Sequence, residues 1–323
     1  MRFAPSLEQR DFVTSMAELL AAADTASVAR SWATGDTGPG RALWRKLADQ
    51  GVLALGLSPE QGGFGATPVD LVLAFEQLGR AAVPGPYVES VAVLPALLSG
   101  TPAADRLDEV GSGAAIATVA LPPTTPRALD GQVADVVYVA GAGTVAAAVI
   151  GASRGSVDAT RLLVDVTAGD LIAEIADTSG AFDLGALATA AQILGLGAAL
   201  LEKSTTYALQ RTQFGKVIGN FQAVKHALAD VAIGLELARP LLFGAALALH
   251  TPDAARDVSA AKVACTDAAY RAARTALQVH GAIGYTAEYD LALWITKVRA
   301  LTSAWGTQAE HRARVSAALK PAS

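Results

Sequence analysis

The uncharged stretch Leu184–Leu201 constrains the fold of this chain more than any other feature of its sequence. Its 18 residues reach about the minimum length of a membrane-spanning helix. However, glycines and a glutamine interrupt the stretch, and its flanks, Asp183 and Glu202, do not give the positively charged end that orients a spanning helix. We therefore expect a helix buried inside a soluble helical bundle, and no membrane span.

Two stripes at helical spacing extend this bundle toward the C-terminus. The first combines large apolar residues, and the second consists mostly of small ones: Phe221, Val224, Leu228, Val231 and Leu235, then Val258, Ala261, Cys265, Ala268 and Ala272. Small side chains allow helices to approach closely. Residues 179–323 are therefore predicted to form a tight C-terminal four-helix bundle.

The rest of the chain divides into two parts with different sequence patterns. Residues 1–112 read as helical, beginning with a capping box in which Ser6 is followed by Gln9. Residues 113–178 contain short β-branched runs separated by Gly and Pro, as in a small antiparallel sheet or partial barrel. The expected strands are 115–121, 133–140, 144–150 and 162–166. The predicted fold class is therefore α+β and mostly α.

The composition and net charge of the chain exclude several classes of function. A net charge of -5 and a pI near 5.4 argue against a nucleic-acid or anionic-membrane surface. The single cysteine, Cys265, excludes an intrachain disulfide, and the charged N-terminal residues do not resemble a signal peptide. We expect a cytoplasmic protein without a metal site.

Two glycine-containing motifs carry the chemistry. One spans residues 211–222 and reads Arg-Thr-Gln-Phe-Gly-Lys-Val-Ile-Gly-Asn-Phe-Gln, and the other spans 278–285 and reads Gln-Val-His-Gly-Ala-Ile-Gly-Tyr. Each closes a helical segment with a cation or an amide beside glycine. This arrangement suits a phosphate-bearing cofactor, because glycine lets backbone approach the phosphate and the cation supplies counter-charge.

These motifs resemble those of the acyl-CoA dehydrogenase family, whose members are flavoenzymes that introduce a Cα–Cβ double bond into acyl thioesters. The resemblance covers most of the chain and rests on five segments: Trp44–Gly51, Pro59–Gly65, Phe75–Arg80, Tyr207–Lys225 and Gln278–Tyr285. It implies an N-terminal helical domain, a reduced β domain and a C-terminal bundle.

The resemblance also implies FAD as cofactor and assigns it residues by position. Arg211 and Phe214 match the family's pair that reaches the FAD of a neighbouring subunit. Gln222 and Gln278 match side chains of the adenosine half, and the backbone at Gly281 and Ala282 would approach the phosphates. His280 is expected to be a packed residue at a helix end rather than a catalyst.

The catalytic base expected of this family is missing from its usual positions. The Glu that removes the α-proton corresponds to Trp305 in one group of members and to Gly185 in another. An indole N–H donates but cannot accept a proton, and glycine has no side chain. Asp183 is the nearest carboxylate; it is either a displaced base or, as we favour, the N-cap of a helix beginning at Leu184. Glu288 is interpreted as a cap or ion-pair residue.

The β region also departs from the family. The loop Ala120–Pro126 lacks the residues that hold the flavin ring and the thioester in other members. The chain thus resembles the shortened subunit of α₂β₂ steroid-CoA dehydrogenases of actinobacteria. It would contribute the adenosine-facing half of a flavin site, while a partner subunit supplies the base; acyl-CoA is the implied substrate and an electron-transfer acceptor the further partner. Two alternatives stay open: a self-sufficient homotetramer with a displaced base, and a non-catalytic scaffold.

Overall fold

A computed structural model describes residues 4–286 and 289–320. Its N-terminal part is helical, and α1 (Leu7–Ala22) begins with the predicted capping box: Ser6 Oγ accepts a hydrogen bond from the Gln9 amide at 3.2 Å, and the Gln9 side chain accepts one from the Ser6 amide. The other helical elements are α2 (Thr25–Ala33), α3 (Gly38–Asp49), η1 (Val52–Ala54), η2 (Pro59–Gln61), α4 (Pro68–Arg80), the π-helical η3 (Val88–Val93), α5 (Leu94–Leu98) and α6 (Arg106–Gly111).

A five-stranded sheet follows, in the order β1-β3-β4-β5-β2. Its strands are β1 (Ala117–Ala120), β2 (Arg127–Leu129), β3 (Val136–Gly141), β4 (Thr144–Gly155) and β5 (Leu162–Glu174). All pairings are antiparallel except that of β1 with β3, which is parallel, so the antiparallel prediction is wrong for this pair. The chain reaches β3 from β1 by way of β2, at the opposite edge, and therefore enters β3 in the direction of β1.

The C-terminal part is the predicted bundle. It consists of α7 (Ser179–Gln210), the hairpin β6 (Thr212–Gln213) and β7 (Lys216–Val217), η4 (Ile218–Asn220), α8 (Gln222–Ala248), α9 (Ala254–His280), η5 (Gly281–Tyr285), α10 (Leu291–Leu301) and α11 (Gln308–Ala318). Among the described residues, α7 and α8 are long and apolar enough to cross a membrane by length and composition alone. In α7, 83% of the apolar window is buried inside the protein, which accounts for its composition; in α8 only 39% is.

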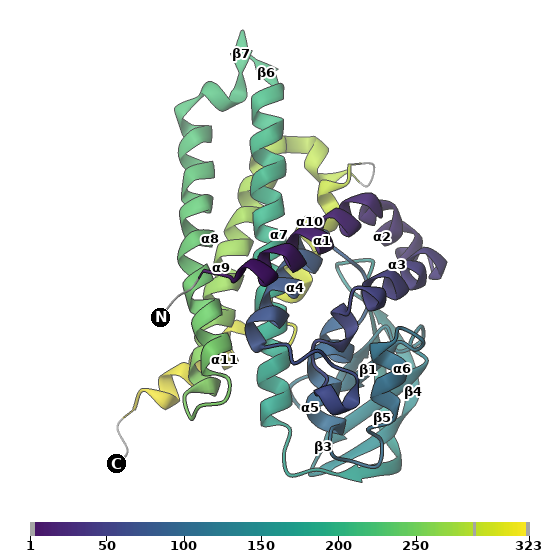
Figure 1. Ribbon diagram of the computed structural model, residues 1–323. Helices are drawn as coiled ribbons and strands as arrows, with labels where there is room; N and C mark the ends of the chain where they lie inside the picture. Colours follow the sequence, from purple (N-terminus) through teal and green to yellow (C-terminus); the bar gives the residue numbers. More distant parts are fainter. Residues whose placement is uncertain (1–3, 287–288, 321–323) are drawn as a thin grey trace.

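Helix α7 joins the parts of the molecule (Figure 1). It runs between the bundle and the N-terminal helices, and two glycines allow α4 to cross it at backbone contact. A Cβ at Gly195 would lie 2.0 Å from the Glu76 carbonyl oxygen, and one at Gly79 would lie 2.0 Å from that of Gln192. Gly195, one of the glycines that interrupt the uncharged stretch, is therefore required by this crossing.

Candidate functional site

The hairpin β6–β7 carries the first predicted cofactor residues. Arg211 caps the C-terminus of α7, and Phe214 and Gly215 occupy the hairpin turn with φ values of 52° and 78°. Two consecutive positive φ angles define a type I′ turn, which usually requires Asn or Gly at its first position. The Phe214 side chain is nevertheless 91% exposed. The hairpin thus holds a large apolar side chain in solvent on a strained backbone.

Arg211 and Gln222 are exposed beside this turn. Gln222 is the first residue of α8, so the free backbone N–H groups of that helix begin here. Within residues 4–286 and 289–320, the Arg211 guanidinium forms no ion pair. An exposed cation close to a helix N-terminus is a favourable setting for an anion.

The second motif lines a separate cavity of about 840 Å³. Gln278, Gly281 and Ala282 form part of its wall, together with Arg274 and Arg299. Gly281 ends α9 with φ of 64°, and a Cβ added there would meet no heavy atom within 4 Å. The backbone at this glycine is therefore open to a ligand, and the nearby donors suit a phosphate.

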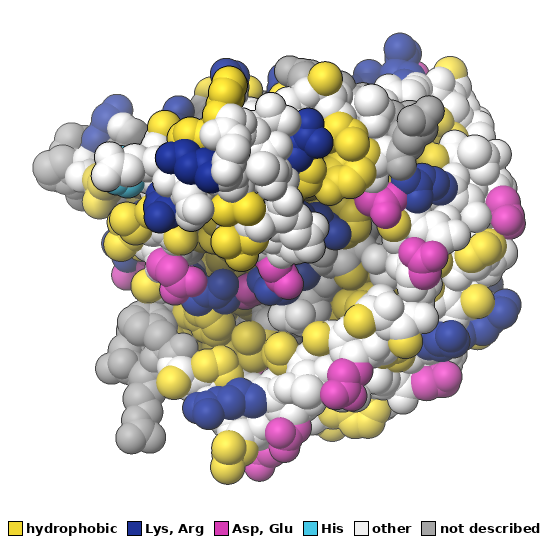
Figure 2. Space-filling model, turned by 90° about the horizontal axis from the view of Figure 1, so that it is seen from above, with side chains coloured by type: hydrophobic (Ala, Val, Ile, Leu, Met, Phe, Trp, Pro, Cys, Tyr) yellow, Lys and Arg dark blue, Asp and Glu magenta, His cyan; other side chains and the backbone are white. Residues whose placement is uncertain are grey.

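Both groups of predicted residues lie at one end of the bundle (Figure 1), because α7 and α9 end there side by side. The buried His280 ring stacks on Tyr207 with centroids 4.2 Å apart, and its Nδ1 lies 2.8 Å from the Ala276 carbonyl oxygen. Figure 2 looks onto this end and shows basic and apolar side chains exposed next to one another. The structure does not bring Arg211, Phe214 and Gln222 into the cavity of Gln278, so these are two patches of one surface.

Trp305 and Gly185 are in contact, although 120 positions separate them in the sequence. A Cβ at Gly185 would lie 2.4 Å from Trp305 Cε3 and 2.5 Å from Cδ2, so the indole rests directly on the α7 backbone. Trp305 is 2% exposed and has φ of 54°. His311 holds this conformation, since its Nε2 lies 2.8 Å from the Trp305 carbonyl oxygen.

Glu89 is a buried carboxylate that the sequence analysis overlooked. It lies on η3, 3% exposed, and its Oε1 accepts a hydrogen bond from Trp305 Nε1 at 3.1 Å. Burial raises the pKa of Glu89, against the opposing influence of Arg161 and the Trp305 bond. Its Oε2 has no hydrogen-bond partner within the described parts of the chain. A single Glu inside an otherwise apolar helical run was the available signal.

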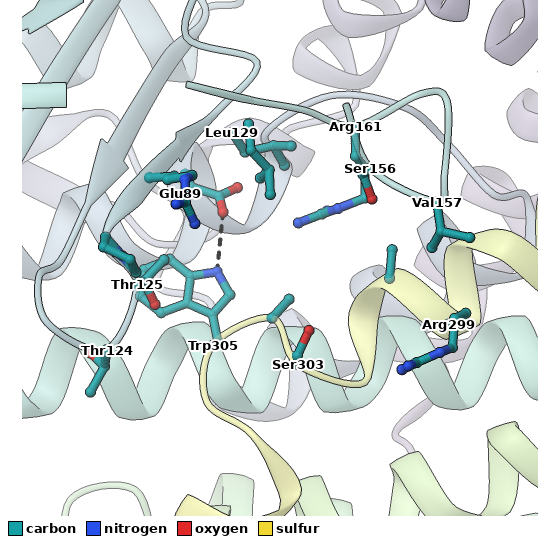
Figure 3. Close-up of a pocket in the computed structure, with 15 residues that line it drawn as sticks. Glu89, Thr124, Thr125, Leu129, Ser156, Val157, Arg161, Arg299, Ser303 and Trp305 are labelled. Atoms are coloured by element: carbon teal, nitrogen blue, oxygen red, sulfur yellow. Dashed lines mark hydrogen bonds between the residues drawn. The ribbon is translucent and has the colours of Figure 1, made fainter. Parts of the chain in front are cut away.

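Glu89 and Trp305 form one side of a cavity of about 530 Å³ between the sheet and the segment joining α10 to α11 (Figure 3). Arg127, Arg161 and Arg299 also line it. The cavity therefore sits where both usual base positions meet, but it contains a buried Glu from a third element.

Two family models and a curated relative match most of the chain. The acyl-CoA dehydrogenase N-terminal domain matches residues 6–106, and the acyl-CoA dehydrogenase C-terminal domain matches residues 175–320. The acyl-CoA dehydrogenase IpdE2 of Mycobacterium tuberculosis is 31% identical over 297 residues, which cover 91% of each chain. The chain belongs to the acyl-CoA dehydrogenase family.

Solved structures agree on the fold of this family. The ChsE4-ChsE5 complex from Mycobacterium tuberculosis superposes with a TM-score of 0.86 at 23% identity, covering 100% of both chains. The Tcur3481-Tcur3483 steroid ACAD, solved as a variant, gives a TM-score of 0.83 at 20% identity, covering 96% of this chain and 97% of that one. The predicted family, its fold and FAD as the family's cofactor are thereby confirmed.

The N-cap interpretation of Asp183 is wrong. Helix α7 begins at Ser179, so Asp183 lies in its second turn, where it is 6% exposed. Its Oδ1 accepts a hydrogen bond from Arg314 Nη2 of α11 at 2.6 Å. Burial raises the pKa of Asp183, and the ion pair with Arg314 opposes this shift. Asp183 therefore ties α7 to α11. Glu288 lies outside the described residues.

Proposed function

We propose that this chain is a subunit of an FAD-dependent acyl-CoA dehydrogenase that acts as a hetero-oligomer and introduces an α,β double bond into an acyl-CoA. It would contribute the adenosine and pyrophosphate half of the flavin site, and a partner subunit would supply the catalytic Glu. One observation carries the proposal: the cofactor residues face solvent, while the two base positions are filled by the contact of Trp305 with Gly185.

The exposure of the half-site supports sharing between chains. Phe214 is 91% exposed in a strained turn, a costly arrangement that a partner's surface would relieve by burial. Arg211 has no carboxylate neighbour within the described ranges, so its charge is available for a pyrophosphate. The open backbone at Gly281 would allow close approach of the same ligand.

An uncovered apolar face on α8 supports assembly into an α₂β₂ tetramer. Ile233, Leu237 and Leu241 recur at four-residue intervals and are 56%, 70% and 48% exposed. Such a stripe marks an interface in a soluble protein. The ChsE4-ChsE5 and Tcur3481-Tcur3483 structures are complexes of two named components, and the second is a steroid ACAD. By analogy, we propose a partner of the same family, a steroid-derived acyl group and a cytoplasmic location.

The mechanism assigns this chain to binding rather than to proton transfer. Bound FAD would supply the hydride acceptor for Cβ. Arg211 and the first N–H groups of α8 would hold the pyrophosphate by charge-assisted hydrogen bonds, and Gln222 and Gln278 would bind the adenosine part. Trp305 Nε1 donates to Glu89, so the indole cannot take the α-proton. The proton would move to the partner's carboxylate.

Flavin retention tests this proposal. The chain would be co-expressed with the products of neighbouring genes to capture its partner, and the FAD content of the complex measured for wild type, Arg211→Gln and Arg45→Gln. Arg45 is an exposed arginine of α3 and serves as the matched control. We expect Arg211→Gln to lose FAD and the control to keep it, because a desolvated pyrophosphate would lack its counter-charge. Unchanged FAD in Arg211→Gln would favour the scaffold function.

Glu89 gives the self-sufficient alternative a specific candidate base. It is a buried carboxylate with one free oxygen, in the cavity where the family's base positions meet. This alternative predicts that the chain purified alone carries stoichiometric FAD, which an acyl-CoA bleaches, and that Glu89→Gln abolishes the bleaching. Our proposal predicts a colourless chain without its partner.

A further inference from the structure

We propose that the cavity beside Trp305 is a binding site for an organic carboxylate that also carries a hydroxyl group, with Arg161 pairing with the carboxylate and Glu89 accepting from the hydroxyl. It adjoins the cavity of Gln278, with which it shares Val157 and Arg299, whereas Arg211 lines neither cavity. It does not depend on which subunit holds the flavin.

The loop that carries Arg161 is held in place by a buried ion pair. The loop from β4 to β5 contains Asp158 and Thr160, which are both 1% exposed. Lys297 of α10 lies 2.8 Å from Asp158 Oδ2 and 2.7 Å from Thr160 Oγ1. Asp158 Oδ1 in turn accepts a hydrogen bond from the Thr160 amide at 2.9 Å. This network fixes the loop backbone, so binding a ligand need order only the Arg161 side chain.

The Arg161 guanidinium extends into the cavity from the side opposite Glu89 (Figure 3). Among residues 4–286 and 289–320 it makes no side-chain hydrogen bond or ion pair. A guanidinium presents paired donors that match the two oxygens of a carboxylate. Its unused donors therefore define where the acid group of a ligand would bind.

The charges around the cavity leave a positive excess for an anion. Arg127 and Arg154 both pair with Asp165 at 2.7 Å, and Lys297 pairs with Asp158, so these five groups leave one positive charge unbalanced. Within the described residues, Arg161 and Arg299 then face two further acids, Glu89 and Asp130. Burial raises the pKa of Asp130 to about 7, which favours its neutral form, so a positive excess remains even when Glu89 is ionised. A carboxylate would supply the missing negative charge.

The Glu89 side of the cavity has buried oxygen atoms that lack a hydrogen-bond donor. Trp305 occupies Glu89 Oε1, but Glu89 Oε2 and Thr125 Oγ1 are both buried and have no partner in the described structure. Buried polar atoms without partners are rare and call for an explanation. A hydroxyl on the ligand would donate to Glu89. Leu129, Leu163 and other apolar residues complete the wall, and about 530 Å³ accommodates a ring-sized body.

Calorimetric titration with matched probes tests the proposal on the complex of the full-length chain with its partner. The probes are cyclohexanecarboxylate, 4-hydroxycyclohexanecarboxylate and cyclohexylmethanol. We expect both acids to bind, the hydroxy acid more tightly, and the alcohol at least about tenfold more weakly. Arg161→Gln should weaken the acids by about tenfold or more, whereas Arg161→Lys should retain part of the affinity and Arg45→Gln all of it.

Glu89→Gln should reduce the preference for the hydroxy acid, because the amide offers a weaker acceptor than the carboxylate. Equal binding of acid and alcohol would refute the site, as would wild-type affinity of the acids in Arg161→Gln. Unfolding curves and FAD content are measured for each variant, so that loss of structure is recognised. If Arg161→Gln does not fold, Arg161→Lys tests the site: partial affinity for the acids supports it, and full wild-type affinity refutes it. Arg211→Gln should lose FAD while binding the acids normally, which separates this inference from the proposed function.

Discussion

Gly185→Ala should destabilise the protein, although Ala is the better helix former. A Cβ at this position would lie 2.4, 2.5 and 2.9 Å from three atoms of the Trp305 indole. Ordinary contact needs about 3.5–4.0 Å, so the ring or the helix must move by about 1 Å. The ring is not free to move, because Glu89 holds Nε1 and His311 holds the carbonyl oxygen.

The expected size follows from these contacts. Overpacking of this kind costs about 1–3 kcal/mol, and loss of the buried Trp305–Glu89 bond adds about 1–3 kcal/mol if the indole shifts. Replacing a helical glycine by alanine stabilises the folded state by about 0.5–1 kcal/mol, which offsets part of this loss. When the bond is lost, the net decrease in unfolding free energy should therefore be about 1–5.5 kcal/mol. With Trp305→Ala in the background the clash disappears, and Gly185→Ala should stabilise by about 0.5–1 kcal/mol.

Urea unfolding of the four proteins in this double-mutant cycle measures the effect. Gly244→Ala in α8 is the control, since a Cβ there meets no heavy atom within 4 Å and only the helix-propensity gain should appear. The sign of the Gly185→Ala effect should reverse when Trp305 is removed. If it is destabilising by the same amount in both backgrounds, Trp305 does not rest on Gly185 and the reasoning is refuted.

Three further predictions concern buried charges. Burial raises the pKa of Asp130 from its ordinary 3.8 to about 7, so the unfolding free energy of the wild type should fall as pH rises between these values, by up to about 1.4 kcal/mol per pH unit. Asp130→Asn should remove this pH dependence, measured by urea unfolding at several pH values. An unchanged pH dependence in Asp130→Asn would contradict the assignment. Lys297→Met should cost about 3–5 kcal/mol of unfolding free energy, because it leaves Asp158 charged and buried; a loss below 1 kcal/mol would show that the pair is open to water. Asp183→Asn should leave turnover of the complex unchanged, whereas loss of a general base would lower it by about 10²–10⁴-fold in steady-state assays.

Local signals in the sequence predicted most elements of this fold. The Ser6–Gln9 capping box, the small-residue stripe of α9 and the burial of α7 follow from patterns within a few helical turns. The elements that were missed lack such patterns. Strand β2 has only three residues, and the second half of β5 is a mostly exposed segment in which Gly169 and Asp170 precede Leu171 and Ile172, so neither shows apolar alternation.

The site was less accessible from sequence because its defining contacts are long-range. Trp305 and Gly185 each read as the loss of a base, but only the fold shows that each requires the other. Glu89 joins them from a third element. The charge of Asp183 makes the uncharged stretch an apparent helix start at Leu184, whereas α7 begins at Ser179 and includes Ala181 and Phe182. The functions of Arg211, Phe214, Gln222, Gln278, Gly281 and Ala282 stay predictions.

The central claim is that the chain holds part of a flavin but lacks a base for turnover. Flavin quantification per polypeptide in the co-purified complex tests it most directly. The account predicts one FAD for every two polypeptides, and a chain that is colourless when purified alone. One FAD for every polypeptide, or stoichiometric flavin in the isolated chain, would contradict it.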